Sequence, residues 1–269
     1  MIMKQLSDYF GQNIKQKRIV ITGGTTGIGK AIADLLISQG GHVFIFGRDP
    51  EDFQKAIDDI RGENPECEIY GTPADVTKKE DIQKIFEMIE RDLGGIDILI
   101  NNAAISANGI TESSFEDFKY VIDTNITGYL AFAEEAVSRM KEQKSGHIIN
   151  IGSMSAETKE PRSTVYVATK GAIRAFSTSL RKEVNPLGIK VSLIEPGSVT
   201  SDMQEDTKEE QKEKIDKMEM LEAEDIAISV LFCISQHKRC DIVTMQIRPH
   251  LQLINTILKK LSKKTALKK

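Results

Sequence analysis

Residues 18–29 read Arg-Ile-Val-Ile-Thr-Gly-Gly-Thr-Thr-Gly-Ile-Gly, a short apolar run that passes directly into a glycine-rich turn. An amphipathic pattern follows over 28–39 and predicts a helix. Strand, glycine-rich turn and helix together form the opening unit of a parallel α/β sheet. The stretch therefore indicates a sheet whose strands alternate with helices.

The rest of the chain repeats this alternation. Short, nearly continuous apolar runs predict further strands at 42–46, 68–71, 96–100, 147–151, 189–194 and 241–247. Amphipathic segments predict further helices near 49–61, 78–93, 114–142, 164–186 and 223–236. Such apolar runs suit strands covered on both faces, and parallel strands need helical crossovers. We therefore predict a single domain over 15–250, a Rossmann-like, doubly wound parallel sheet of about seven strands in three α/β/α layers.

Composition and charge limit the partners, metal sites and compartment that the sequence predicts. The 269 residues are 40% hydrophobic and carry a formal net charge of −4, so the charge predicts no nucleic-acid partner. The three cysteines are widely spaced, which suits reduced thiols, and the four histidines are scattered over loops or surface, which predicts no metal site. The sequence has no apolar run of eighteen residues and no signal-peptide pattern, so we expect a cytoplasmic protein without membrane insertion.

Three segments fall outside the regular pattern. Residues 1–14 form an N-terminal extension, and residues 251–269 form a basic tail that is either solvated or in weak contact with an anionic surface. Residues 202–222 are rich in Glu and Lys and directly follow a predicted strand. They are interpreted either as a solvated helical excursion or as a flap over a substrate site.

The glycine-rich turn is a candidate phosphate site. Its glycines allow a sharp turn and close approach of a pyrophosphate, and the helix that follows presents free N–H groups to an anion. The predicted contacts are Thr22, Gly23, Thr25, Gly27, Ile28 and Gly29. A turn that uses glycine for steric reasons alone is the alternative.

Residues after the next strands suggest the rest of a dinucleotide site. Arg48 stands where a carboxylate would bind the adenine ribose of NAD, and its guanidinium matches a 2′-phosphate, so NADP is preferred to NAD. Asp75 and Val76 could meet an adenine edge, although Asp75 could equally cap a helix. Asn102 and Ala103 would allow close approach of a ligand, and a plain turn would explain them too.

A second group of residues suggests proton transfer. Tyr166 and Lys170 are four apart in a predicted helix, which puts a phenol beside an ammonium, and a positive charge lowers a phenol's pKa. Ser153 closes a predicted strand, and such strand ends form the ligand crevice of an α/β sheet. Alone, each could be an ordinary surface or turn residue. Together they predict a hydroxyl pair that binds a carbonyl oxygen, with Tyr166 as acid and base.

These pieces follow the order and spacing of a known family. Over 15–248 the chain resembles the compact, single-domain short-chain dehydrogenases/reductases. The resemblance implies that Asn125 joins Ser153, Tyr166 and Lys170 in a catalytic tetrad and holds a water, and that Lys170 also binds the nicotinamide ribose. It further implies that Pro196, Gly197, Val199 and Ser201 shape the nicotinamide pocket, with Ser201 where the family often has threonine.

The resemblance implies an oxidoreductase that moves hydride between NADP(H) and a carbonyl/alcohol pair such as a ketone, keto acid or hydroxy acid. An NAD-linked alcohol dehydrogenase of the same fold, a non-catalytic NADP(H) sensor, and an isomerase or dehydratase are the alternatives. The last strand lacks the glycine-rich ending of β-ketoacyl-carrier-protein reductases, which weakens that role. Apolar residues over 115–140 and 166–184 predict a homodimer or homotetramer, with core packing as the alternative explanation.

Overall fold

A computed structural model describes residues 14–159, 161–201 and 206–251. One sheet of seven parallel strands runs through this part of the chain, in the order β3-β2-β1-β4-β5-β6-β7. The strands are β1 (Arg18–Thr22), β2 (His42–Phe46), β3 (Ile69–Gly71), β4 (Ile98–Asn101), β5 (Gly146–Ile151), β6 (Ile189–Pro196) and β7 (Thr244–Ile247). The strand order reverses between β1 and β4, which is where open α/β sheets bind ligands. The predicted doubly wound α/β fold is confirmed.

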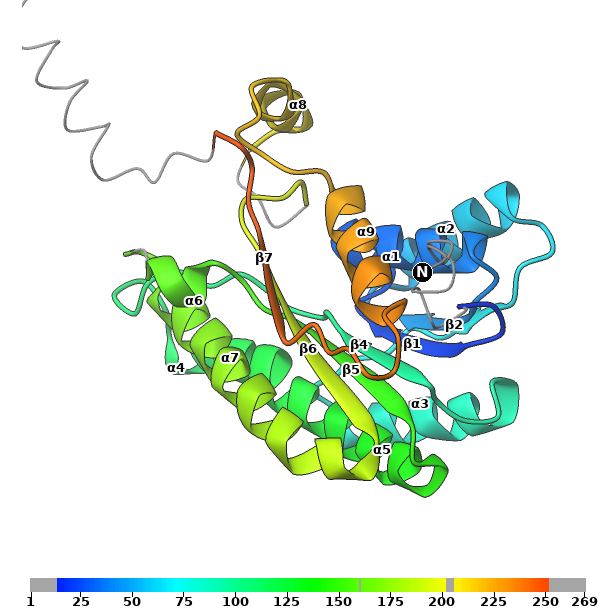
Figure 1. The fold of residues 1–269 in the computed structure, drawn as a ribbon. Helices are drawn as coiled ribbons and strands as arrows, with labels where there is room; N and C mark the ends of the chain where they lie inside the picture. The colour runs from blue at the N-terminus through cyan, green and yellow to red at the C-terminus, as the bar shows by residue number, and fades with distance from the viewer. Residues whose placement is uncertain (1–13, 160, 202–205, 252–269) are drawn as a thin grey trace, which may run out of the picture.

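Helices cover both faces of the sheet (Figure 1). The long helices are α1 (Gly27–Ser38), α2 (Pro50–Glu63), α3 (Lys79–Asp92), α5 (Gly128–Gln143), α7 (Thr164–Val184) and α9 (Ala223–Ile234). The shorter elements are α4 (Phe115–Ile122), the π-helical turn η2 (Asp123–Thr127), α6 (Ser155–Thr158), the 3₁₀ turn η3 (Asn185–Leu187) and α8 (Lys208–Asp216).

Successive strand residues build two cores. Ile19 and Ile21 of β1 pack with α1, α2 and α9 on one face, whereas Val20 packs with α3, α5 and α7 on the other. Because neighbouring strand residues point to opposite faces, a nearly continuous apolar strand serves both layers. These two cores hold the strand ends in fixed register.

The structure corrects three element predictions. Residues 114–142 form no single helix, because the π-helical turn η2 interrupts it between α4 and α5. The fourth and seventh strands begin at Ile98 and Thr244, later than expected. Asp97, just before the fourth strand, is bound to the first residue of β1: its N–H donates to the Arg18 carbonyl at 2.8 Å, and its carboxylate accepts from the Arg18 backbone and side chain.

The predicted flap is described from residue 206 onward. It contains α8, which begins at a capping box made by Thr207 and Glu210 and has no buried residue. The base of the excursion returns to the sheet edge, because Leu221 exchanges backbone hydrogen bonds with Ser198 and Thr200. Predictions for the N-terminal extension and the basic tail fall almost wholly outside the described residues. Within the described part, no helix is long and apolar enough to cross a membrane.

Candidate active site

A cleft of about 990 Å³ lies along the carboxyl edge of the sheet. Its size suits a large ligand together with a small one. Most residues predicted for the site line it: Gly23, Thr25, Gly27, Ile28, Arg48, Asp75, Val76, Asn102, Ala103, Ser153, Tyr166, Lys170, Pro196, Gly197, Val199 and Ser201. The other three, Thr22, Gly29 and Asn125, are buried behind the lining.

The glycine-rich turn forms a cradle at the start of α1. Gly23 and Gly27 have φ values of +62° and +50°, which favour glycine. Thr26 begins the helix without a side-chain cap, and the first turn has no acidic residue. The N–H groups of that turn therefore face the cleft without a capping side chain, at the positive end of the helix dipole. The cradle fits a pyrophosphate.

Thr22 and Gly29 support this cradle from behind. The Thr22 hydroxyl accepts hydrogen bonds from the backbone N–H groups of Asn102 and Ala103, at 2.9 and 2.8 Å. The Asn102 amide in turn donates to the Thr22 and Gly23 carbonyls, at 3.1 and 3.0 Å. A Cβ on Gly29 would lie 2.0 Å from the Gly23 oxygen. Thr22 therefore joins β1 to the loop after β4, and Gly29 allows α1 to approach Gly23 closely; their contact with a cofactor stays a prediction.

Arg48 lies at the end of the cleft beyond β2, where it contacts a residue that the sequence analysis missed. Its guanidinium donates a hydrogen bond to the Tyr120 hydroxyl and lies 5.5 Å from the centre of the Tyr120 ring. The same hydroxyl donates to Asp75 Oδ2 at 3.5 Å, while Asp75 Oδ1 accepts from the Thr77 N–H and hydroxyl. Tyr120 sits on an ordinary amphipathic stretch, so no local signal marked it.

Ser153, Tyr166 and Lys170 meet at the other end of the cleft. Lys170 is buried on α7, where its ammonium donates to the Ile151 carbonyl at 3.0 Å. That ammonium lies 5.6 Å from the centre of the Tyr166 ring and 5.5 Å from that of Tyr129. Ser153 follows β5; its hydroxyl donates to the Ser155 hydroxyl at 3.1 Å and lies close enough to Tyr166 to act on the pKa of that phenol. The predicted pairing of phenol and ammonium is present in the structure.

Burial sets the acid–base character of this group. Burial raises the pKa of the Tyr166 phenol, and hydrogen bonding to Ser153 only partly opposes this effect. Burial also lowers the pKa of Lys170 from 10.5 to about 7. In the protein without cofactor the pKa of the phenol is raised, because removal from water outweighs the hydrogen bond with Ser153. The lowering expected from Lys170 together with an oxidised nicotinamide stays a prediction.

Asn125 acts on a loop of the cleft. It lies in the π-helical turn η2, a type of irregularity often found at functional sites. Its side chain accepts from the Ile105 N–H and donates to the Ile105 carbonyl, both at 2.9 Å, and donates to Thr169 at 3.3 Å. Both amide donors are thus engaged with protein atoms. Ile105 lines the cleft, so Asn125 positions the segment after β4.

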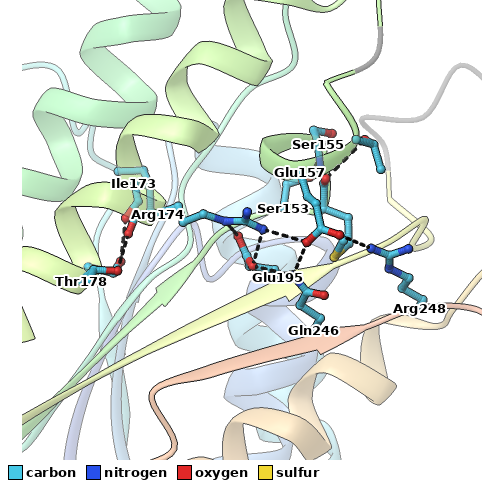
Figure 2. Close-up of polar contacts among 12 residues, drawn as sticks. Ser153, Ser155, Glu157, Ile173, Arg174, Thr178, Glu195, Gln246 and Arg248 are labelled. Carbon is cyan, nitrogen blue, oxygen red and sulfur yellow. Dashed lines mark hydrogen bonds and ion pairs between the residues drawn. The ribbon is translucent and has the colours of Figure 1, made fainter.

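An ionic cluster supports the substrate end (Figure 2). Glu195 is fully buried on β6 and receives a two-point contact from Arg174 of α7, at 2.7 and 2.8 Å. Glu157 of α6 accepts from Arg174, Gln246 and Arg248, at 3.4, 2.7 and 3.2 Å. The cluster ties α6, which follows Ser153, to α7 and β7. It therefore fixes the turn that carries Ser153.

The loop after β6 completes the lining. Pro196, Gly197 and Val199 line the cleft directly after the strand end. Ser201 accepts and donates backbone hydrogen bonds with the side chain of Gln211 of α8, at 3.3 and 3.2 Å. Gln211 thus joins α8 of the predicted flap to the cleft lining.

One histidine, His147, does not lie in a loop or at the surface as predicted. His147 is buried in β5, with Nε2 2.9 Å from the Ser192 hydroxyl, and burial lowers its pKa to about 3. It is therefore a neutral structural residue, neither in a loop nor on the surface. Across the described ranges, no three His, Cys, Asp or Glu side chains gather as a metal ion would need.

Comparisons with known proteins agree with this architecture. The family model described as short chain dehydrogenase matches residues 17–212. An uncharacterized oxidoreductase of Staphylococcus aureus strain MRSA252 is 35% identical over 237 residues, covering 88% of this chain and 98% of that protein. One from Staphylococcus saprophyticus is 32% identical over the same shares. A short-chain type dehydrogenase/reductase from Mycobacterium ulcerans has a TM-score of 0.79 at 22% identity, covering 88% of this chain and 90% of that one.

Proposed function

The chain belongs to the short-chain dehydrogenase family, and on that premise we propose that it is an NADP(H)-preferring oxidoreductase of a small carbonyl/alcohol pair. One observation carries the proposal. Ser153, Tyr166 and Lys170 converge at one end of a cleft whose other parts hold the glycine cradle and Arg48. A single ligand spanning the cleft would bring a reactive ring beside the phenol.

The residues present fit a nicotinamide dinucleotide. The uncapped first turn of α1 and the positive φ at Gly23 and Gly27 suit its pyrophosphate. Lys170 and Tyr166 would hold the nicotinamide ribose, and Pro196 with Gly197 would hold the ring. When bound, the dinucleotide supplies or accepts the hydride.

Ser153 and Tyr166 supply the proton chemistry. Both hydroxyls face the substrate oxygen and donate hydrogen bonds that strengthen as negative charge builds there, which stabilises the transition state. In reduction the Tyr166 O–H bond breaks, the proton joins the substrate oxygen, and the electron pair stays on the phenolate. Lys170, held by the Ile151 carbonyl, lies close enough to stabilise that phenolate. In alcohol oxidation the phenolate takes the proton back.

The NADP preference rests on Arg48. Of the ion pairs between described residues, none involves Arg48. The nearest carboxylate in sequence, Asp49, caps α2 by accepting from the Glu51 and Asp52 N–H groups, at 2.8 and 3.1 Å. The guanidinium charge is thus available for a 2′-phosphate.

The test is turnover of a carbonyl and alcohol panel with NADPH or NADP⁺, followed at 340 nm, in wild type and Tyr166→Phe. Loss of an acid–base group typically costs about 10²–10⁴-fold, so Tyr166→Phe should fall by that factor. Tyr70→Phe is the matched control, because Tyr70 lies outside the cleft lining. Near-normal turnover of Tyr166→Phe would refute the mechanism. Tight NADPH binding with no turnover of any panel member would favour the sensor alternative.

We also propose that the protein assembles as a homodimer or homotetramer. Phe115 of α4 and Leu130 of α5, both within the apolar segment 115–140, are 63% and 43% exposed, and a partner subunit would remove them from water. Light scattering of the purified chain measures its mass in solution. A monomer at micromolar concentration would contradict this proposal.

A further inference from the structure

We propose that Tyr120 is a cofactor-specificity residue, which positions Arg48 for the 2′-phosphate of NADP(H). The inference rests on the proposed function and adds a residue to it. It starts from a contact between segments far apart in sequence: Arg48 follows β2, Asp75 follows β3, and Tyr120 lies on α4. All three side chains line the same end of the cleft.

Arg48 needs a partner to hold a defined position. It is exposed and follows Gly47 at the end of a strand, so its long side chain would otherwise sample many rotamers. Tyr120 gives it two contacts, a hydrogen bond to the hydroxyl and a cation–π contact with the guanidinium carbon 5.5 Å from the ring centre. The hydrogen bond to Tyr120 uses one of the five guanidinium N–H groups, so other N–H groups can donate to a ligand. A phosphate can then receive a two-point contact from a group already oriented.

The Tyr120 hydroxyl is itself held in place. It has one proton to donate and points it at Asp75 Oδ2, 3.5 Å away, while its lone pairs accept from Arg48. Asp75 is fixed in turn by the Thr77 N–H and hydroxyl, at 2.9 and 2.8 Å. The phenol therefore stands between the carboxylate and the guanidinium. Without its hydroxyl, Arg48 could turn to Asp75 and lose part of its attraction for a phosphate.

We expect substitution of Tyr120 to weaken the binding of NADP⁺ selectively. Tyr120→Phe keeps the ring but removes the hydroxyl, and we expect NADP⁺ affinity to fall roughly threefold to tenfold, the range of the net contribution of one ordinary hydrogen bond. NAD⁺ has no 2′-phosphate, so its affinity should change less than twofold. Tyr120→Leu, which also removes the aromatic ring and its cation–π contact, should reduce NADP⁺ affinity further.

The experiment is calorimetric titration of the full-length protein with NADP⁺ and with NAD⁺, which needs no substrate. Wild type is compared with Tyr120→Phe, Arg48→Leu and the double variant, and Tyr70→Phe serves as the matched loss of a tyrosine hydroxyl away from the cleft. If Tyr120 acts through Arg48, the Tyr120→Phe effect on NADP⁺ must vanish in the Arg48→Leu background. A merely structural role would persist there and would weaken NAD⁺ binding equally.

The outcomes separate this inference from the proposed function. A selective NADP⁺ loss in Tyr120→Phe that disappears in the double variant supports it. Unchanged NADP⁺ affinity in Tyr120→Phe, with a clear loss in Arg48→Leu, overturns the role of Tyr120 and leaves the NADP preference standing. An Arg48→Leu variant that keeps the wild-type NADP⁺/NAD⁺ ratio overturns the NADP preference itself. Equal losses in Tyr120→Phe and Tyr70→Phe also overturn the inference.

Discussion

Substituting Lys170 by Met should make the folded protein more stable while abolishing its activity. Lys170 is 2% exposed, and burial lowers its pKa from 10.5 to about 7. Met has a similar length and no charge, so it fills the space without the cost of desolvation. The Ile151 carbonyl loses its ammonium donor but keeps the Tyr129 hydroxyl, 3.0 Å away.

The magnitude follows from the pKa difference. The drop from 10.5 to about 7, at about 1.4 kcal/mol per pH unit, corresponds to a desolvation penalty of about 4 kcal/mol at pH 7. Loss of the charge-assisted hydrogen bond returns about 1.5–3 kcal/mol. We therefore expect Lys170→Met to be about 1–3 kcal/mol more stable than wild type at pH 7.

The pH dependence has a definite sign. The folded-state pKa of Lys170 lies below the unfolded one, so between pH 7 and 10.5 the unfolded chain binds more protons. The penalty is complete below pH 7 and disappears as pH rises to 10.5. The stability advantage of Lys170→Met should therefore shrink by about 2 kcal/mol between pH 7 and pH 9.

Urea unfolding of both proteins at pH 7 and pH 9 measures this difference. Lys182→Met is the matched control, because Lys182 is exposed on the same helix and should change stability by less than about 0.5 kcal/mol at either pH. We expect NADPH oxidation to be lost in Lys170→Met and retained in Lys182→Met. A Lys170→Met protein less stable than wild type at pH 7, or an advantage that does not shrink at pH 9, would refute the burial argument.

Three further predictions concern the scaffold of the cleft. Burial holds the pKa of His147 near 3, below its unfolded value, so the folded protein loses stability as pH falls from 7 to 5. Urea unfolding at both pH values should show a loss about 2 kcal/mol larger in wild type than in His147→Gln. An equal loss in the two proteins would contradict this prediction. Arg174→Ala removes the guanidinium from the fully buried Glu195, which keeps a hydrogen bond from the Gln246 amide at 3.2 Å. We expect a cost of about 3–5 kcal/mol in thermal or urea unfolding, partly recovered by Arg174→Lys, and a cost below about 1 kcal/mol would argue against the cluster. Gly29→Ala puts a Cβ 2.0 Å from a backbone oxygen and should lower the free energy of unfolding by about 3 kcal/mol. Gly171→Ala, on α7 with open space around it, should be neutral or stabilising by about 0.5–1 kcal/mol. Equal unfolding midpoints of the two variants would refute the packing argument.

The order of elements could be predicted because the signals are local. Apolar runs at β1 and β2 match the observed strands Arg18–Thr22 and His42–Phe46 residue for residue. The interruption at Asp123–Thr127 could not be foreseen, because a π-helical turn keeps the helical periodicity nearly intact on both sides. Tyr120 was missed for a different reason: its partners lie 45 and 72 residues away.

Local chemistry along the chain determined the fold class, the phosphate cradle and the pairing of Tyr166 with Lys170, because strand burial, glycine backbone freedom and helical spacing each act over a few residues. The direction in which polar side chains face required the folded arrangement. Thr22 and Asn125 turn away from the cleft to hold its loops, whereas Tyr120 turns into it beside Arg48. Those orientations, and the pKa values that burial imposes on Tyr166 and Lys170, depend on which segments the sheet order brings together and on how much water they exclude.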